Sequence, residues 1–248
     1  DPRFYVAVVH DGTTTDYTTG PIKIHYDPVT KTYPLTKISS SQMNFGIEWG
    51  SMDSQSAGYS NTGYYMNKYW TGALGYKQNI AQPKIDPLIR MADLYLMYAE
   101  AVNEAYGPRG TAQGYRLSAL DAVNLVRARV NMPPVRDEYT VAPDIFRERI
   151  RNERNVELCY EGHHYFYDIR RWKIAPLTMD SSVNPLYGMY VEKCEVSPEH
   201  PAGRKYERRK LAENRQGVWK DCMYYLPFPD SEALKMKNQL NELEVERQ

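Results

Sequence analysis

The sequence has few of the features that mark several large classes of protein. Its 248 residues include only three cysteines, too few for a disulfide scaffold, and no apolar run approaches the roughly 18 residues of a membrane-spanning helix. Thirty-one basic residues balance 31 acidic ones. The chain therefore has no net field to collect nucleic acid or an anionic membrane, and it suits a neutral ligand. Nucleotide-binding loops, G-x-S-x-G elbows and H-E-x-x-H sites are also absent from the sequence.

Tyrosine, by contrast, is abundant, with 22 Tyr against five Phe and four Trp. Several aromatic residues gather between residues 49 and 70, beside a loop-like stretch rich in Ser, Gly and Asn. Flat aromatic faces stack on sugar rings, while amides and carboxylates bind hydroxyls. We therefore expect a sugar site here, with Trp49, Tyr59 and Trp70 stacking on rings and Asn61, Asp53 and Gln55 binding hydroxyls. The alternative, stronger for Tyr64 to Trp70, is that these rings pack the segment onto the helices.

The chain changes character twice along its length. Residues 1–85 predict strands and loops, including a β-rich Phe4–Val9 and an alternating Ile22–Tyr26. Residues 86–175 predict a helical core. Residues 176–248 predict an irregular extension without a clear period, followed by a C-terminal segment with a final helical turn.

The helical core contains four stretches with apolar residues at every third or fourth position. The first helix is expected from Pro87, after a cap at Asp86, and the others span about 117–130, 143–161 and 163–173. The first two form an antiparallel pair of the tetratricopeptide type. One pair is too little for a repeat array, which needs about three repeats.

Three carboxylates stand at helical spacing in the third expected helix: Glu153, Glu157 and Glu161. On one helix face these like charges repel, so cations must approach them. The nearby cations are Arg149, Arg154, Arg170 and Arg171. We interpret Glu153, Arg154, Glu157, Glu161, Arg170 and Arg171 as a structural ion-pair network that joins the third and fourth helices. The alternatives are a carboxylate pair for glycoside hydrolysis and a Glu/His metal site.

Metal and cofactor chemistry finds little support in the sequence. His163 and His164 are adjacent, so on a helix they point about 100° apart and do not chelate one ion together. We therefore expect no metal site and no cofactor. Cys159 is expected to be buried and inert, whereas Cys194 and Cys222 have the option of pairing in an oxidising compartment.

Six blocks follow one another along nearly the whole chain. They are DPRFY at 1–5, TGYYMNKY at 62–69, RMADLYLMYAEA at 90–101, AL with NLVRAR within 119–129, ERIRNERNVELCYEGHHYFYDIRRW at 148–172, and YLPFP at 225–229. This ordered set resembles the SusD/RagB family, the surface glycan-binding lipoproteins of certain Gram-negative outer membranes. The chain departs from the family pattern at His164, where the family usually has Arg, so one partner of the ion-pair network changes.

The resemblance implies a mainly α fold, with a tetratricopeptide-like helix pair, irregular loops and a small β element. The family's proteins are much longer, so we expect this chain to be a C-terminal portion. The implied function is non-catalytic binding of an oligosaccharide at the surface of the outer membrane, for delivery to a SusC-like TonB-dependent transporter. The membrane link is expected to be a lipid anchor outside this chain. The alternatives are a helical glycoside hydrolase using Glu157 or Glu161, and a protein-interaction scaffold that binds no sugar.

Overall fold

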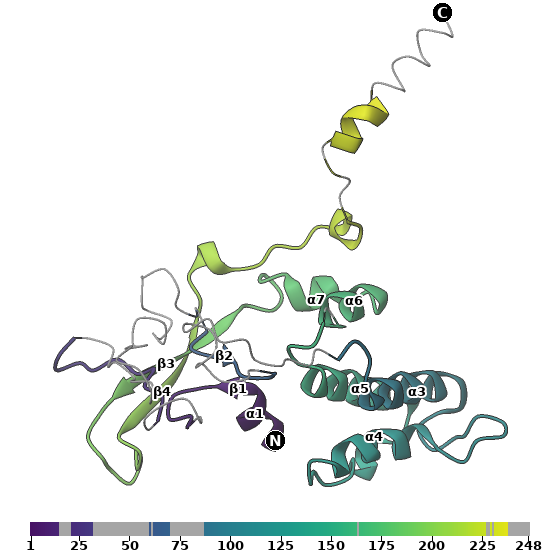
Figure 1. Cartoon of the computed structure of the whole chain (residues 1–248), viewed down its shortest axis with the longest axis horizontal. Coiled ribbons are helices and arrows are strands. Elements are labelled where there is room, and N and C mark those ends of the chain that lie inside the picture. The colour runs from purple at the N-terminus through teal and green to yellow at the C-terminus, as the bar shows by residue number, and fades with distance from the viewer. Residues whose placement is uncertain are drawn as a thin grey trace, which may run out of the picture. The chain divides into compact units, whose positions relative to one another are not determined.

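The computed structural model describes residues 1–14, 21–31, 60, 62–69, 87–162, 164–226, 229 and 231–237. These residues form a mainly α structure with a few short strands (Figure 1). The chain divides into two units: Asp1–Tyr167 with Tyr187–Leu211, and Asp168–Leu186 with Ala212–Gln248. Within the described ranges, no helix combines the length and the hydrophobicity needed to cross a membrane.

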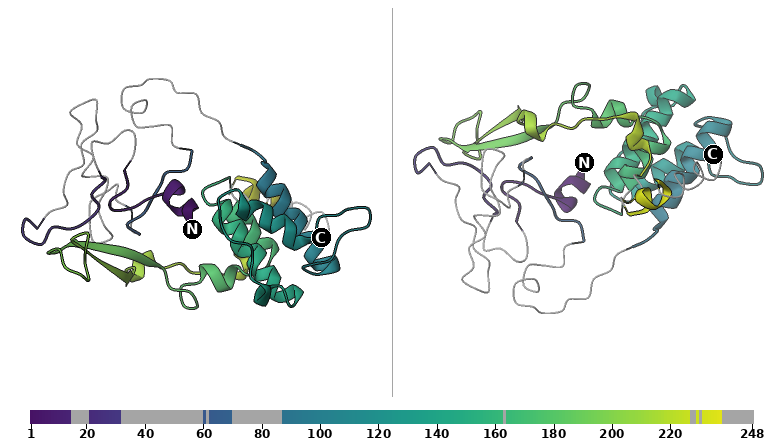
Figure 2. Two further views of the ribbon diagram at one scale, coloured as in Figure 1. Left: turned by 90° about the horizontal axis from the view of Figure 1, so that it is seen from below. Right: turned by 90° about the horizontal axis from the view of Figure 1, so that it is seen from above.

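Three helices make the core of the larger unit: α3 (Met91–Tyr106), α4 (Ala119–Ala128) and α5 (Pro143–Glu157). Figures 1 and 2 show them side by side, and α3 packs against both of the others. Alanines on α3 and α4 allow the backbones to approach closely. The buried cluster consists of Ala92, Leu96, Ala99, Val102, Ala119, Ala122, Val123, Val126, Phe146 and Ile150.

The ends of these helices follow local chemistry. A capping box starts α4: the Ser118 hydroxyl accepts from the Asp121 backbone N–H, and the Asp121 carboxylate accepts from that of Ser118, both at 3.1 Å. The expected start of the first helix at Pro87 is wrong, because α3 begins at Met91 after an extended Arg90. The Arg90 side chain reaches carboxylates elsewhere in the unit.

The third helix is shorter than expected. It ends at Glu157, because Tyr160 (φ 63°) and Gly162 (φ 48°) adopt left-handed backbone conformations that no α-helix continues. Glu161 therefore lies in the turn after α5 and does not share a helix face with Glu153 and Glu157. The next helix, α6 (His164–Arg171), falls within the expected range.

The strand expected over Phe4–Val9 is wrong for most of its length. Residues Pro2–Ala7 form a short helix, α1, and only Val8–Val9 form a strand, β1, which pairs antiparallel with β2 (Tyr65–Met66). The Asp1 carboxylate caps α1 by accepting the Arg3 backbone N–H at 3.0 Å, and Pro2 occupies the first turn. These start signals outweigh the β propensity of the segment that follows.

The alternation in Ile22–Tyr26 predicts burial but not a strand. Ile22 and Ile24 are completely buried, and Val9 and Tyr65 pack with them. Only Tyr26 makes a β-bridge, parallel to Glu192.

A long hairpin lies in the stretch expected to be irregular, so that expectation is wrong. Strands β3 (Tyr187–Lys193) and β4 (Arg204–Lys210) pair antiparallel, with Val191 opposite Tyr206. Five of the seven residues of β4 are basic, so polar and apolar residues do not alternate along it.

The smaller unit contains α7 (Ala175–Met179). Short 3-10 helices occur at Asp137–Tyr139, Glu213–Arg215 and Asp221–Tyr224.

The helical core generates a prediction about stability. Phe146 on α5 is completely buried, whereas its neighbour Ile145 is 38% exposed. We expect Phe146→Ala to lower the free energy of unfolding by about 3–5 kcal/mol, because it removes buried surface and leaves a cavity. Ile145→Ala is the matched control and should cost much less. Urea unfolding followed by circular dichroism measures both, and equal losses would contradict the assigned packing.

Candidate functional site

The residues expected to bind sugar all lie outside the described residues, so their role stays a prediction. They are Trp49, Asp53, Gln55, Tyr59, Asn61 and Trp70. The described residues that flank them are anchored. The Ser60 backbone N–H donates to Tyr65 Oη at 3.1 Å, and the Asn67 side-chain amide donates to the Val6 carbonyl at 3.0 Å. The predicted loop is thus bounded by residues fixed to β2 and α1.

A buried cluster of three carboxylates forms the charged centre of the larger unit. Glu153 and Glu157 lie one turn apart on α5, and Glu161 lies in the following turn; they are 2%, 2% and 6% exposed. Buried carboxylates are costly unless each is paired and hydrogen-bonded. The surrounding cations therefore decide whether this cluster stabilises the fold.

Glu157 binds three guanidinium groups from three different segments. Arg3 Nη1 on α1 lies 2.9 Å from Glu157 Oε2, and Arg90 Nη1 before α3 lies 2.6 Å from Oε1. Arg129, at the end of α4, donates from Nη2 to both oxygens, at 2.8 and 3.0 Å. This one carboxylate thus links α1, α3, α4 and α5.

The neighbouring carboxylates share some of these cations. Glu153 accepts from Arg3 Nη1 at 2.6 Å and from Arg127 Nη1 at 2.8 Å. Glu161 accepts from Nε and Nη2 of Arg90, both at 2.6 Å, and forms an ion pair with Lys68. Lys68 also donates to the Glu157 carbonyl at 2.7 Å. All three carboxylates therefore have at least two cationic partners.

These partners correct the sequence interpretation, which drew its cations from residues 149–171. The cations come instead from Arg3, Lys68, Arg90, Arg127 and Arg129. Each of them lies in one of the blocks that carry the family resemblance, and that was the only signal pointing to them. The expected cations make other contacts: Arg154 with Asp93 (2.9 Å), Arg171 with Asp168 (2.8 Å), and the guanidiniums of Arg149 and Arg170 over the rings of Tyr139 (3.9 Å) and Trp219 (5.3 Å).

The cations keep two of the carboxylates ionised. Burial by itself would raise the pKa of Glu157, but hydrogen bonds from Arg3 and Arg90 outweigh it and hold the pKa below its ordinary value. Burial likewise opposes ionisation of Glu161, but hydrogen bonds from Arg90 and Lys68 lower its pKa. A general acid requires a raised pKa, so neither carboxyl has the protonation behaviour of a catalytic acid.

A cavity of about 780 Å³ lies beside the charged centre. Arg3, Arg90, Arg129 and Glu157 form its charged part. Its lining also includes Asn67, Lys68 and Tyr69, the residues that directly precede the predicted ligand residue Trp70 in the sequence. The cavity thus combines guanidinium groups, an amide and an aromatic ring.

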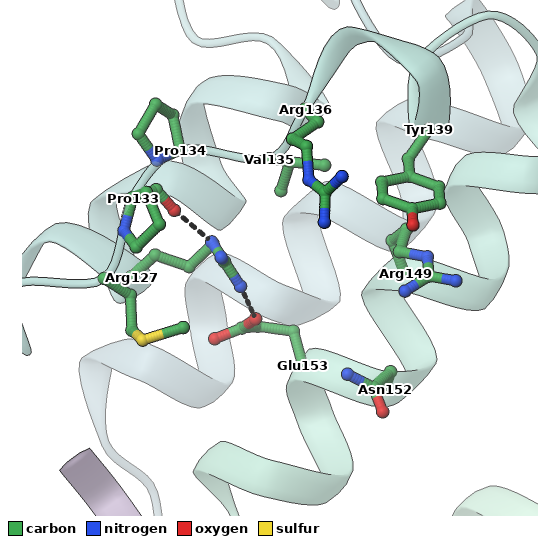
Figure 3. A pocket seen from close by; sticks show the side chains of 10 residues that line it. Arg127, Pro133, Pro134, Val135, Arg136, Tyr139, Arg149, Asn152 and Glu153 are labelled. Carbon is green, nitrogen blue, oxygen red and sulfur yellow. Dashed lines mark hydrogen bonds and ion pairs between the residues drawn. The ribbon is translucent and has the colours of Figure 1, made fainter. Parts of the chain in front are cut away.

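A second cavity, of about 430 Å³, lies between α5 and the loop that follows α4 (Figure 3). Arg127 and Glu153 border one side of it, and Arg127 Nε also donates to the Pro133 carbonyl at 2.8 Å. The opposite side carries Tyr139 and Arg149, with the guanidinium over the ring. The charged centre and the smaller cavity therefore share the Arg127–Glu153 ion pair.

Metal-ligating groups do not gather in the described part of the chain, where no three His, Cys, Asp or Glu residues are placed to hold an ion. Cys159, Cys194 and Cys222 are free thiols. Cys159 is only half-buried, against the expectation of full burial, and burial raises the pKa of its thiol.

The chain belongs to the SusD family, because the model of that family matches residues 1–242. It is 30% identical over 137 residues to a SusD-like protein of Formosa agariphila, a match that covers 55% of this chain and 24% of that protein.

Solved structures show the same fold. A SusD-like protein from Bacteroides fragilis matches with a TM-score of 0.61 and 26% identity, over 95% of this chain and 37% of its own. A second structure from that species is described as a SusD-like carbohydrate-binding protein. It matches with a TM-score of 0.54 and 26% identity, over 94% of this chain and 40% of its own. The chain thus spans well under half the length of these relatives.

The charged centre generates a prediction about stability. We expect Glu157→Gln to lower the free energy of unfolding by about 3–5 kcal/mol, because it leaves three guanidiniums without their shared counter-charge. Glu148→Gln on the same helix is the control; the Glu148 side chain in its pair with Arg151 is 63% exposed, so the pair should be worth at most about 1 kcal/mol. Denaturant unfolding at neutral pH compares the two, and similar losses would show that the centre contributes little.

The lowered pKa values predict the direction of the pH dependence. Below about pH 4.5, the ordinary value for a glutamate, the unfolded chain takes up protons at Glu157 and Glu161 that the folded chain does not. The free energy of unfolding should therefore fall as the pH drops from about 5 towards 3. The fall should be smaller in Glu157→Gln, which lacks one of these groups. Thermal melts across this range measure it, and equal slopes in the two proteins would contradict the assignment.

Proposed function

We propose that this chain is part of a non-catalytic protein that captures oligosaccharides at the cell surface. Membership of the SusD family over residues 1–242 is the observation that carries the proposal. The similarity to a structure described as a SusD-like carbohydrate-binding protein supports it further. Because the chain spans only part of its relatives, residues outside it are expected to add contacts to the site.

The aromatic loop is proposed to provide the stacking surfaces. Trp49, Tyr59 and Trp70 would lie against sugar rings, and the polar residues Asn61, Asp53 and Gln55 would bind the hydroxyls. The larger cavity supports this assignment, because Asn67, Lys68 and Tyr69 line it and directly precede Trp70 in the sequence. Each aromatic stacking contact contributes modestly, so affinity should come from several contacts together.

The charged centre argues against the hydrolase alternative. A glycosidase needs one carboxyl that stays protonated near neutral pH and a second that remains free to attack or to activate water. Glu157 and Glu161 are instead buried under guanidinium and ammonium groups that hold them ionised. These contacts favour a structural role for both residues.

Delivery is the further part of the proposal. The captured glycan would pass to a SusC-like TonB-dependent transporter at the outer membrane, and a lipid anchor outside this chain would hold the protein there. Family membership supports this arrangement. The scaffold alternative predicts binding to the transporter but to no sugar, so a glycan titration separates the two.

The proposal predicts loss of glycan binding when the loop is altered. Isothermal titration calorimetry with a panel of oligosaccharides should give heat for the wild-type chain, and Trp49→Ala should lose most of it, because a stacking face is removed. Tyr115→Ala is the control, since this exposed ring lies between α3 and α4. Unchanged binding by Trp49→Ala would remove this residue from the site.

Turnover assays address the enzyme alternative separately. We expect no release of reducing sugar from any oligosaccharide that the chain binds. Release that is abolished by Glu157→Gln, in protein that remains folded by circular dichroism, would overturn the non-catalytic assignment.

A further inference from the structure

We propose that the smaller cavity binds the anionic substituent of an acidic sugar, either the carboxylate of a uronate or a sulfate ester. This inference rests on the proposed function, since it names the chemical class of glycan that such a protein would capture. It concerns the cavity between α5 and the loop after α4, and not the predicted aromatic loop.

Arg149 supplies the charge for this site. Its guanidinium lies 3.9 Å from the centroid of the Tyr139 ring, and it has no carboxylate partner among the described residues. The ring holds the guanidinium in position through a cation–π contact without neutralising it. A positioned cation on the wall of a cavity is available to an anion from solvent.

The remaining charges of the cavity do not oppose an anion. Glu153 accepts from both Arg3 and Arg127, so its charge is already balanced inside the protein. Arg136 contributes a second guanidinium near the Tyr139 ring, at 5.8 Å. Its partner Glu138 lies 3.1 Å away, and both side chains are more than half exposed, so this pair is weak and can exchange for a ligand.

The other walls fit the rest of a sugar. Pro133, Pro134 and Val135 provide an apolar surface of fixed shape, and Asn152, one turn along α5 from Arg149, provides an amide for a hydroxyl. Figure 3 shows these groups around one space. Its volume of about 430 Å³ lies within the range of small-ligand sites, about 300–1,000 Å³.

The chemistry favours an anion over a neutral sugar. A guanidinium offers only donors, and its planar fork matches the paired oxygens of a carboxylate or sulfate. A neutral sugar offers hydroxyl oxygens to these donors but no charge, so it gains less from Arg149 than an anion does. The zero net charge of the chain does not contradict this, because the excess of positive charge is local to the cavity.

Calorimetry on the whole 248-residue chain tests the inference with three matched probes: oligogalacturonate, a sulfated galactan oligosaccharide and a neutral galactan oligosaccharide. We expect binding of at least one anionic probe, with about tenfold or greater loss of affinity in Arg149→Gln. Arg149→Lys keeps the positive charge but loses the planar fork of donors. Its affinity for the anionic probe should lie between those of the wild type and Arg149→Gln. Arg147→Gln removes the same charge from α5, away from the cavity, and should bind as the wild type does.

The outcomes separate this inference from the proposed function. Anionic binding that Arg149→Gln weakens in folded protein supports the inference, and the probe that binds identifies carboxylate or sulfate. Equal affinity for neutral and anionic probes, or unchanged anionic binding in Arg149→Gln, overturns it. Neutral binding that Trp49→Ala removes, without binding of either anionic probe, overturns this inference alone. The absence of binding to any sugar overturns both.

Discussion

The larger unit depends on one buried interaction, the neutralisation of Glu157 by Arg3, Arg90 and Arg129. A carboxylate that is 2% exposed is tolerable only with its hydrogen bonds made, and here the donors come from three separate segments. The interaction therefore stabilises only the arrangement in which α1, the start of α3 and the end of α4 all contact α5. The apolar core supplies the burial, while the charged centre specifies which segments meet.

The same centre explains why the chain resembles its family so clearly. The cations around Glu153, Glu157 and Glu161 all lie inside the sequence blocks that carry the likeness. Those blocks therefore report first how the fold is held together. Ligand binding is proposed for the predicted aromatic loop and for the two cavities that border the centre, whose walls include residues of the same blocks.

Charge has a different meaning at the two scales of this protein. Over the whole chain, acids and bases cancel, which disfavours binding of polyanions by a general field. Within the centre, each carboxylate is satisfied by cations, so its charge is unavailable for catalysis. At the smaller cavity, one guanidinium rests on an aromatic ring and not on a carboxylate, which leaves it available to a ligand.

The sequence by itself determined the helices, the mainly α class and the family, because helical periodicity, caps and block order are local features of the chain. Even so, it misplaced the start of the first helix and missed the α1 turn and the β3–β4 hairpin, where start signals or cross-strand pairing outweigh local propensity. Only the tertiary structure decided the partners of Glu157 and placed Glu161 in the turn after α5. Arg3 and Glu157 are 154 positions apart, and no local pattern encodes a contact that forms only when distant segments pack together.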